Sequence, residues 1–462
     1  MDRALADRVA ELAAAYAEAV RDARVAPTVS PGELGEALGG ELPDHGDDPR
    51  SVIEELATAA TPGLVATTGP RYFGFVIGGA LPAAAAADML AVAWDQCAGM
   101  YSLSPAAAVV EDVVQGWILD LLDLPREACV GFTTGAQMAT FTGLAAARHE
   151  VLSRVGWDVE RDGLQGAPRV NVLVGDEVHV TVLAALRMLG LGEGTAVRVP
   201  ADDQGRMVPA ELARILAGLS GPTIVSAQAG CVNTGAFDPL DHIAPLVRDA
   251  GAWLHVDGAF GLWAAASPAT RHLVAGRELA DSWAVDFHKW LNVPYDSAAA
   301  IVRHPEAQRA AMRFMAAYIV RDEDAPRDPA DLVPESSRRA RGFAVWAALR
   351  QLGRSGVTQL VDRFCALARQ AAEALSREPG VRILNEVVLN QVLFALDDDP
   401  MGDPTRDAIS RVQRDGTCWI GGTIWKGEPA IRLSVSSWMT TEVDIDRSVE
   451  AIIGSIRATR AS

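Results

Sequence analysis

Lysine is almost absent from this chain of 462 residues, which contains only Lys289 and Lys426 although lysine and arginine together number 41. Any chemistry that needs a primary amine on a side chain is therefore restricted to these two positions. Lys289 follows His288 and precedes Trp290. This setting makes Lys289 the first candidate for such chemistry.

Cysteine is also scarce. The five cysteines are scattered, odd in number and form no C-x-x-C pair; they are Cys97, Cys129, Cys231, Cys365 and Cys418. This pattern argues against a disulfide framework and against a zinc site, and it fits a reducing cytosol. We expect free thiols and no bound metal.

The chain also lacks a net positive charge and long apolar runs. The formal net charge is −19 and the isoelectric point is near 4.9, whereas a nucleic-acid partner would require a basic face. No uninterrupted apolar run reaches about 18 residues, and the N-terminus lacks the basic and apolar segments of a signal peptide. We expect a cytoplasmic protein with neither a nucleic-acid nor a membrane partner.

The composition is that of a globular protein, with 49% hydrophobic residues and a length that suggests two or three domains. Residues 2–24 repeat apolar positions at three-to-four spacing, which predicts an amphipathic helix. Between residues 85 and 300, helical stretches alternate with short apolar runs at 129–132, 170–174, 223–227, 253–256 and 298–302. Such alternation predicts an α/β fold with a mainly parallel sheet.

The C-terminal part has a different pattern. Residues 338–377 are typical of a long helix that is kinked or broken near Gly353 and Gly356, and the runs 391–396 and 431–435 are typical of strands. We therefore expect three regions. They are a helical N-terminal arm (1–75) that packs on something else, a large α/β domain (76–340) and a small α+β domain (341–462).

An anion could bind where the first predicted strand ends. The run 129–132 leads into Thr133, Thr134, Gly135, Ala136 and Gln137, after which a helix-favouring stretch begins. Free backbone N–H groups at such a helix N-terminus hold a phosphate well. Threonine and glycine are also ordinary capping and turn residues, so this signal is weak alone.

Two further residues follow apolar runs. Asp257 ends the run 253–256, and ligands of open α/β sheets bind at the carboxyl ends of strands. A carboxylate there could keep the pyridine nitrogen of pyridoxal phosphate (PLP) protonated, or it could cap the next turn. His179 follows the run 170–174 and could stack on a cofactor ring, although a lone histidine more often starts a helix or packs in a core.

The order of these features is more informative than any one of them. A phosphate turn, His179, Asp257 and then Lys289 arrive in sequence, with 32 positions from Asp257 to Lys289. A lysine can hold PLP as an imine, and His288 beside it could reach the phosphate or simply pack at a strand end. Together the four features favour a PLP site.

The chain resembles the group II PLP-dependent amino-acid decarboxylases, which include the aromatic-L-amino-acid decarboxylases, within the fold-type I (aspartate aminotransferase-like) superfamily. The resemblance extends over nearly the whole length. It is carried by residues 70–75, 103–106, 133–140, His179, 233–238, 255–257, 288–291, 338–341 and Trp346.

The resemblance implies a role for each site residue. Lys289 would form the aldimine with PLP, Asp257 would pair with the pyridine nitrogen, and His179 would stack on the ring. Gly135, Ala136 and His288 would help to hold the phosphate, and Thr134, Gln137 and Ala259 are further candidates for cofactor binding.

The resemblance also implies a decarboxylation that ends with protonation of Cα by a tyrosine on a mobile loop. Tyr318 matches that position, and the alternative is that it merely packs a loop. In this family a phenylalanine there accompanies aldehyde formation, so Tyr318 favours simple decarboxylation. The rival functions are another PLP reaction, such as transamination or aldehyde synthesis, and a non-catalytic PLP-fold binding protein.

Substrate choice is less defined. An apolar and aromatic wall from Tyr72, Phe73, Tyr101 and Leu103 favours an aromatic or other hydrophobic amino acid. Arg432 could hold the substrate carboxylate, or it could be a structural arginine. The N-terminal arm would be explained if it wrapped a second subunit, so we expect a homodimer with its sites at the interface.

Overall fold

The structure is a computed structural model that describes residues 2–314, 327–397, 399 and 401–461. The chain forms two compact units. The central unit comprises Ala80–Ala366 and Asn385–Gln391, and the terminal unit comprises Met1–Gly79, Leu367–Leu384 and Val392–Ser462. The three-region division expected from the sequence stays a prediction.

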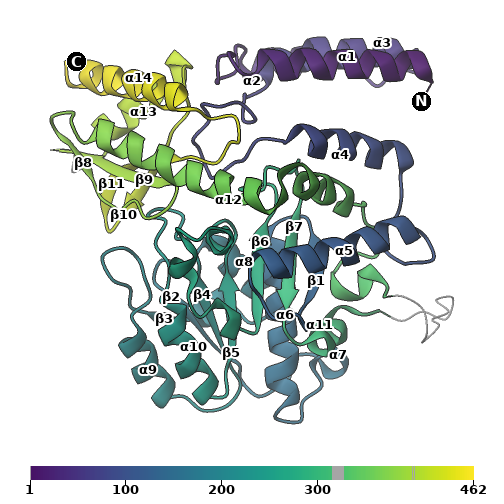
Figure 1. Ribbon diagram of the computed structural model, residues 1–462, viewed down its shortest axis with the longest axis vertical. Coiled ribbons are helices and arrows are strands. Elements are labelled where there is room, and N and C mark those ends of the chain that lie inside the picture. Colours follow the sequence, from purple (N-terminus) through teal and green to yellow (C-terminus); the bar gives the residue numbers. More distant parts are fainter. Residues whose placement is uncertain (1, 315–326, 398, 400, 462) are drawn as a thin grey trace. The chain divides into compact units, whose positions relative to one another are not determined.

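The central unit is built on a seven-stranded sheet with the strand order β1-β7-β6-β5-β4-β2-β3 (Figure 1). The strands are β1 (Cys129–Thr133), β2 (Asn171–Gly175), β3 (Val197–Val199), β4 (Thr223–Gln228), β5 (Trp253–Asp257), β6 (Ser282–Asp286) and β7 (Ala298–Val302). β7 is antiparallel to both of its neighbours, and the other pairings from β6 to β3 are parallel. The prediction of a mainly parallel sheet is confirmed.

The central strands are buried along their length, which explains their largely apolar sequences, because helices cover both faces of such a sheet. The helices are α4 (Pro82–Trp94), α5 (Pro105–Leu121), α6 (Ala136–Ser153), α7 (Val159–Asp162), α8 (Val180–Met188), α9 (Pro209–Ala217), α10 (Leu240–Asp249) and α11 (Pro305–Met312). Short 3₁₀ turns lie at Glu193–Thr195, Gly261–Ala266, Arg271–Val274, Arg277–Leu279 and Pro329–Leu332. Helix α6 contacts the strands β1, β4, β5, β6 and β7, and it also contacts the helices α8 and α11. It is therefore the main helix that packs on this sheet.

The long helix α12 (Gly342–Leu375) continues from the central unit into the terminal unit. Its regular geometry is interrupted at Gly353, where φ is 60° and ψ is 178°. A positive φ favours glycine, because other residues carry a Cβ that crowds the backbone there. The break that the sequence predicted near this residue is confirmed.

The terminal unit combines helices with a four-stranded sheet of order β10-β11-β9-β8. Its elements are α1 (Arg3–Ala19), α2 (Pro31–Leu38), α3 (Pro49–Ala60), a 3₁₀ turn (Thr61–Gly63), β8 (Val381–Ile383), β9 (Gln391–Leu396), α13 (Asp403–Asp415), β10 (Gly421–Trp425), β11 (Glu428–Ser434) and α14 (Glu442–Arg460). In the part of the chain that is described, no helix is long and apolar enough to cross a membrane.

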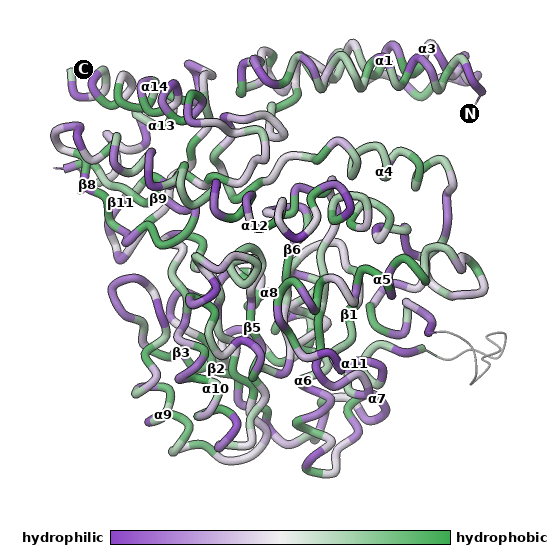
Figure 2. Tube along the Cα trace, viewed as in Figure 1, coloured by the Kyte–Doolittle hydropathy of each residue, from purple (hydrophilic) through white to green (hydrophobic). Residues whose placement is uncertain are grey.

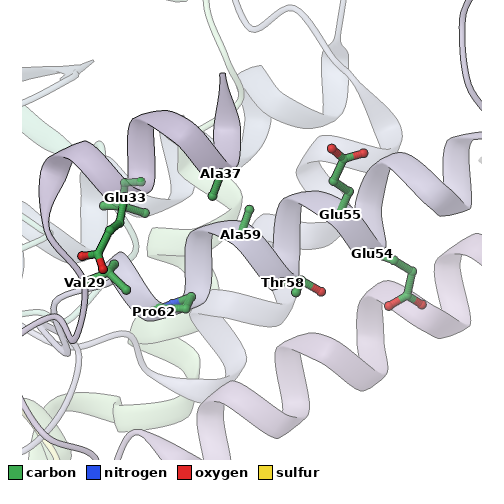
Figure 3. A pocket seen from close by; sticks show the side chains of 9 residues that line it. Val29, Glu33, Ala37, Glu54, Glu55, Thr58, Ala59 and Pro62 are labelled. Atoms are coloured by element: carbon green, nitrogen blue, oxygen red, sulfur yellow. The ribbon is translucent and has the colours of Figure 1, made fainter. Parts of the chain in front are cut away.

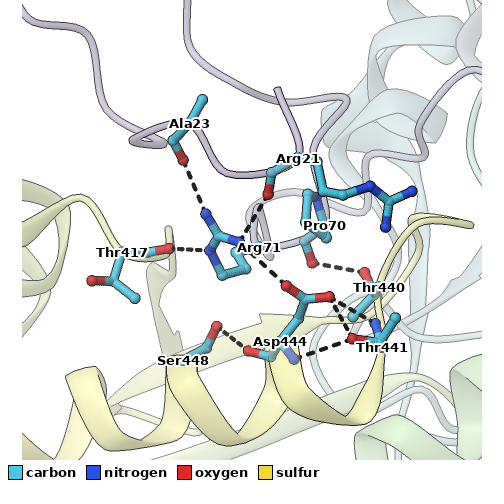
Figure 4. A network of polar contacts seen from close by, with 9 residues as sticks. All are labelled: Arg21, Ala23, Pro70, Arg71, Thr417, Thr440, Thr441, Asp444 and Ser448. Atoms are coloured by element: carbon cyan, nitrogen blue, oxygen red, sulfur yellow. Dashed lines mark hydrogen bonds and ion pairs between the residues drawn. The ribbon is translucent and has the colours of Figure 1, made fainter. Parts of the chain in front are cut away.

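A buried arginine joins distant segments of the terminal unit (Figure 4). The Arg71 side chain is 2% exposed and donates to the carbonyl oxygens of Arg21, Ala23 and Thr417. Its guanidinium also pairs with the Asp444 carboxylate at 3.2 Å. One side chain thus ties the segment after α1 to the loop before β10 and to the start of α14.

Helices α2 and α3 enclose a groove of about 480 Å³ (Figure 3). Its lining is apolar at Leu34, Ala37 and Ala59 and carries the carboxylates of Glu33 and Glu55. Both helices begin at a side-chain cap, since Ser30 and Asp48 accept hydrogen bonds from the first turns of α2 and α3.

Candidate active site

Several of the predicted site residues lie at the carboxyl edge of the central sheet. Strands β1, β5 and β6 run in the same direction, because β1 and β6 are both antiparallel to β7 and β6 is parallel to β5. β5 ends at Asp257, β6 ends at Asp286, and β1 ends two residues before Gly135. Ligands of α/β sheets bind at this edge.

The turn after β1 forms the N-terminus of α6, as the sequence predicted. Gly135 is the N-cap residue, and its backbone is extended. The Ala136 N–H donates to Oδ1 of Asp286 at 2.7 Å. Gly135 lies beside His288, since a Cβ added at Gly135 would be 3.5 Å from Cε1 of that ring. The N-terminus of α6 therefore already binds an anion, which is the carboxylate of Asp286.

Asp286 is the residue that sequence reasoning missed. Its side chain is 2% exposed, and its Oδ2 lies 2.7 Å from Nζ of Lys289. Its Oδ1 lies 3.4 Å from Nε2 of His288, in addition to accepting the Ala136 N–H. One buried carboxylate thus contacts a helix N-terminus, an imidazole and the amine. The signal that could have found it is an acidic residue at the end of an apolar run, the same signal that identified Asp257.

His288 is held on both edges of its ring. The Ser297 N–H donates to its Nδ1 at 3.2 Å, so the hydrogen-bond pattern assigns the ring hydrogen to Nε2, which faces Asp286. Burial lowers the pKa of His288, against the opposing effect of Asp286, so the ring is neutral at physiological pH. Tyr295 stacks on it with ring centroids 4.3 Å apart. Tyr295 was also missed, and no local pattern in the sequence marks it.

Asp257 is 6% exposed at the end of β5, where its register partners are Gln228 on β4 and Ala284 on β6. Its Oδ1 accepts the Ala259 N–H at 3.2 Å. The turn-capping interaction that the sequence left open is therefore present. It does not exclude a contact with a cofactor, because a carboxylate can accept several hydrogen bonds at once.

His179 is the N-cap of α8, where Nδ1 lies 2.7 Å from the Thr181 hydroxyl and accepts the Thr181 N–H at 3.4 Å. The helix-start alternative is thus what the structure shows. Stacking of this ring on a cofactor stays a prediction.

The remaining predicted residues are spread over both units. In the central unit, Leu103 is half exposed and the Tyr101 N–H donates to Asp328. In the terminal unit, Tyr72 stacks on Trp419 with ring centroids 5.9 Å apart, and Phe73 is 1% exposed.

Four other candidates complete the predicted set. Arg432 lies on β11 opposite Gly421. Gln137 is exposed in the first turn of α6, and Thr134 is partly buried just before it. Tyr318 lies outside the described residues.

These groups fit PLP by the chemistry of their donors. Lys289 supplies the primary amine with 22% of its side chain exposed, and the start of α6 supplies backbone N–H groups for a phosphate. His288 carries a hydrogen-bond donor beside that helix end, and Asp257 supplies a carboxylate for a ring nitrogen. In contrast, Lys426 lies on the β10–β11 turn of the terminal unit, where it contacts the Trp425 ring.

Comparison with known proteins gives a consistent result. The family profile described as "Pyridoxal-dependent decarboxylase conserved domain" matches residues 31–397. Tryptophan decarboxylase 1 of Oryza sativa subsp. japonica is 25% identical over 470 residues, which cover 95% of this chain and 90% of that protein. An acidic amino acid decarboxylase of Homo sapiens is 28% identical over 372 residues, which cover 79% of this chain and 70% of that protein.

The fold has a counterpart among solved structures. The crystal structure of Oryza sativa TDC with PLP and tryptamine matches with a TM-score of 0.91 at 24% identity, covering 99% of this chain and 97% of that chain. The α/β fold predicted from the sequence, with its resemblance to PLP-dependent enzymes, is confirmed.

Proposed function

Because the chain belongs to the pyridoxal-dependent decarboxylase family, we propose that it converts an aromatic or other hydrophobic L-amino acid into the amine and carbon dioxide. Its cofactor is PLP, and it is a carboxy-lyase. The observation that carries the proposed site is the Asp286 cluster, in which Lys289 Nζ, His288 and the N-terminus of α6 converge on one buried carboxylate. This cluster brings the candidate amine and the candidate phosphate site together.

When bound, PLP supplies an aldehyde for a lysine amine and a ring that accepts the electrons of the broken bond. We assign the amine to Lys289, whose Nζ is oriented by Oδ2 of Asp286 at 2.7 Å. Asp257 is assigned to the ring nitrogen, where its charge would keep a proton in place. The N–H groups of the first turn of α6 and Nε2–H of His288 are assigned to the phosphate. On binding, the phosphate would take the place of the Asp286 carboxylate at the Ala136 N–H and at Nε2–H of His288.

Tyr318 is proposed as the acid that delivers a proton to Cα after carbon dioxide leaves. The sequence alone supports this role. Replacing Tyr318 with phenylalanine keeps the ring and removes the acidic hydroxyl, so amine production should fall. Aldehyde should appear instead, with dissolved dioxygen as the oxidant and with ammonia and hydrogen peroxide as the other products. An unchanged ratio of amine to aldehyde would remove Tyr318 from the mechanism.

The substrate class rests on the sequence-based prediction that Tyr72, Phe73, Tyr101 and Leu103 form an apolar wall and that Arg432 holds the substrate carboxylate. The relatives include enzymes named for tryptophan and for acidic amino acids. An aromatic or hydrophobic substrate is favoured because the proposed wall carries no charge. An acidic substrate would require a second cation for its side-chain carboxylate.

We also propose a homodimer with sites near its interface. Helices α4 and α5 are largely hydrophobic along their length (Figure 2). They expose Met89, Leu90, Val92, Trp94, Val109 and Val113. A patch of this kind on a globular protein is typical of a protein–protein interface. Tyr101 and Leu103 lie in the loop that joins these helices, which would place the substrate wall beside the second subunit.

A cytoplasmic location is part of the proposal and is supported by thiol chemistry. All five cysteines are free, and Cys129, Cys231, Cys365 and Cys418 are buried. Protein cysteines remain in this state in a reducing compartment.

The experiment is an incubation of the purified holoenzyme with single L-amino acids: tryptophan, tyrosine, phenylalanine, leucine, glutamate and aspartate. Carbon dioxide, amine, aldehyde and keto acid are measured in the same reactions. Carbon dioxide and amine from an aromatic or hydrophobic substrate, lost in Lys289→Ala and kept in Lys426→Ala, are expected. Activity only on glutamate or aspartate contradicts the substrate class, and a dominant aldehyde or keto acid contradicts simple decarboxylation.

A further inference from the structure

A row of polar side chains lies one level below Asp257 in the central sheet. Ser226 on β4, His255 on β5 and Ser282 on β6 are register partners. Register partners on neighbouring strands point to the same face, and positions two residues apart on one strand share that face. The row therefore lies directly behind the Gln228–Asp257 pair, and all three of its side chains are buried.

One end of the row is fully hydrogen-bonded. The Trp253 indole N–H donates to the Ser282 hydroxyl at 2.9 Å, and that hydroxyl lies 2.9 Å from Nδ1 of His255. Because the hydroxyl accepts from the indole and has one hydrogen to give, the pattern assigns Nδ1 as its acceptor and leaves the ring hydrogen on Nε2. Burial lowers the pKa of His255 to about 3, so the ring carries no charge.

The other end of the row is not satisfied. Among the described residues, neither Nε2 of His255 nor Oγ of Ser226 has a hydrogen-bond partner, and both atoms are buried. Unpaired polar atoms in a protein interior are costly, and ordered water commonly satisfies them. The two ring nitrogens of an imidazole point away from each other, so Nε2 faces away from Ser282.

Ser226 lines a cavity of about 10 Å³ together with Glu177, Gln228, Asp238 and Asp257. A space of this size holds one water, and the polar lining gives that water several partners. Ser226 is 3% exposed, so its hydroxyl has no access to bulk solvent. The hydroxyl and the Asp257 residue therefore share a small polar space.

We propose that one ordered water occupies this cavity and joins the Ser226 hydroxyl to the Asp257 carboxylate, which makes Ser226 a positioning residue for Asp257. The inference rests on the proposed role of Asp257 toward the cofactor ring. The neutral state of the His255 ring also supports the proposed role of Asp257. A charged imidazole behind Asp257 would compete for its carboxylate, whereas a neutral one leaves the protonated ring nitrogen as its counter-charge.

The test compares Ser226→Thr with Ser226→Val, because these side chains have nearly the same shape and only threonine keeps a hydroxyl. The dissociation constant of PLP from the holoenzyme and the pH dependence of the bound-cofactor absorbance are measured, together with the melting temperature of each protein without cofactor. Ser226→Val should weaken PLP binding about 10-fold and shift the pH profile, by analogy with outer-shell contacts in metal sites. Ser226→Thr should stay within about 2-fold of the unmodified protein by the same reasoning, since it keeps the donor.

Two controls separate the possible failures. Thr223→Val removes another buried hydroxyl from β4, one that donates to the Gly221 carbonyl, and should leave PLP binding unchanged. Asp257→Asn reports on the proposed function itself. If Asp257→Asn changes the absorbance and affinity but the two Ser226 variants behave alike, the water bridge is refuted; if Asp257→Asn changes nothing, the assignment of Asp257 fails first.

A crystal structure of the holoenzyme gives a second, direct readout. A water within hydrogen-bond distance of both Ser226 Oγ and an Asp257 carboxylate oxygen is expected. A dry cavity, or a direct contact between the two side chains, overturns the proposal even if the variants lose affinity.

Discussion

Helix α6 approaches the polar row so closely that residue 143 has no room for a side chain. A Cβ added at Gly143 would lie 2.9 Å from Nδ1 and 3.0 Å from Cε1 of His255, and 3.3 Å from the Ser282 hydroxyl. Neither partner moves freely, because the His255–Ser282 hydrogen bond and the surrounding sheet fix both. Gly143→Ala must therefore displace the imidazole or lift α6 from the sheet.

The magnitude follows from opposing contributions. Overpacking of a core by one methyl group costs about 1–3 kcal/mol, and loss of the His255–Ser282 hydrogen bond adds about 1 kcal/mol. Alanine gains about 1 kcal/mol over glycine in a helix interior. The free energy of unfolding should fall by about 1–3 kcal/mol overall.

Gly454→Ala is the matched control, because Gly454 lies in α14 and a Cβ added there meets nothing within 4 Å. This variant should be as stable as the unmodified protein or gain up to about 1 kcal/mol. Urea denaturation midpoints of the three proteins, measured at equal protein concentration, test the difference. If Gly143→Ala matched Gly454→Ala, the close packing of α6 on His255 would be wrong.

Three further predictions concern buried charges and are all measured by denaturation midpoints. Glu111→Gln should lower stability by about 3–5 kcal/mol, since it leaves the fully buried Arg338 without its counter-charge; a change below about 1 kcal/mol would contradict the pairing. Burial raises the pKa of Asp238 from 3.8 to about 6. The contribution of Asp238 to the free energy of unfolding is therefore complete below the unfolded pKa of 3.8 and is lost as the pH rises through about 6. The destabilisation by Asp238→Asn should therefore be about 1 kcal/mol larger at pH 5 than at pH 7, and a pH-independent difference refutes the shift. Arg71→Met should destabilise by about 3 kcal/mol or more, because Asp444 and three carbonyl oxygens lose their donor; a neutral effect would show that water replaces the guanidinium.

Much of the central unit could be predicted because its strands are buried on both faces. Each expected run between residues 129 and 302 falls on an observed strand, with ends that agree or differ by one residue. β6 was not among the predicted strands, although it carries Asp286 and leads to Lys289. The strand begins with Ser282 and ends with Asp286, so its apolar run is only three residues long, whereas β7 is apolar throughout.

The sequence could supply a list of candidate site residues but not the contacts among them. Chain order and strand ends identified Lys289, Asp257 and the turn at Gly135, because those signals are local. The convergence on Asp286 requires that β1 and β6 end at the same edge of the sheet. They do so because both strands are antiparallel to β7, which lies between them. Long-range contacts such as that of Arg71 with Thr417 likewise have no local signature.

The near absence of lysine makes the central claim directly testable. The holoenzyme is treated with borohydride, which fixes the cofactor to the amine that holds it, and the digested protein is mapped by mass spectrometry. The account predicts that the reduced PLP adduct is found on the peptide that contains Lys289 and not on the peptide that contains Lys426. An adduct on Lys426 alone, or cofactor that is released without any adduct, would contradict the assignment of Lys289 and of the site built around it.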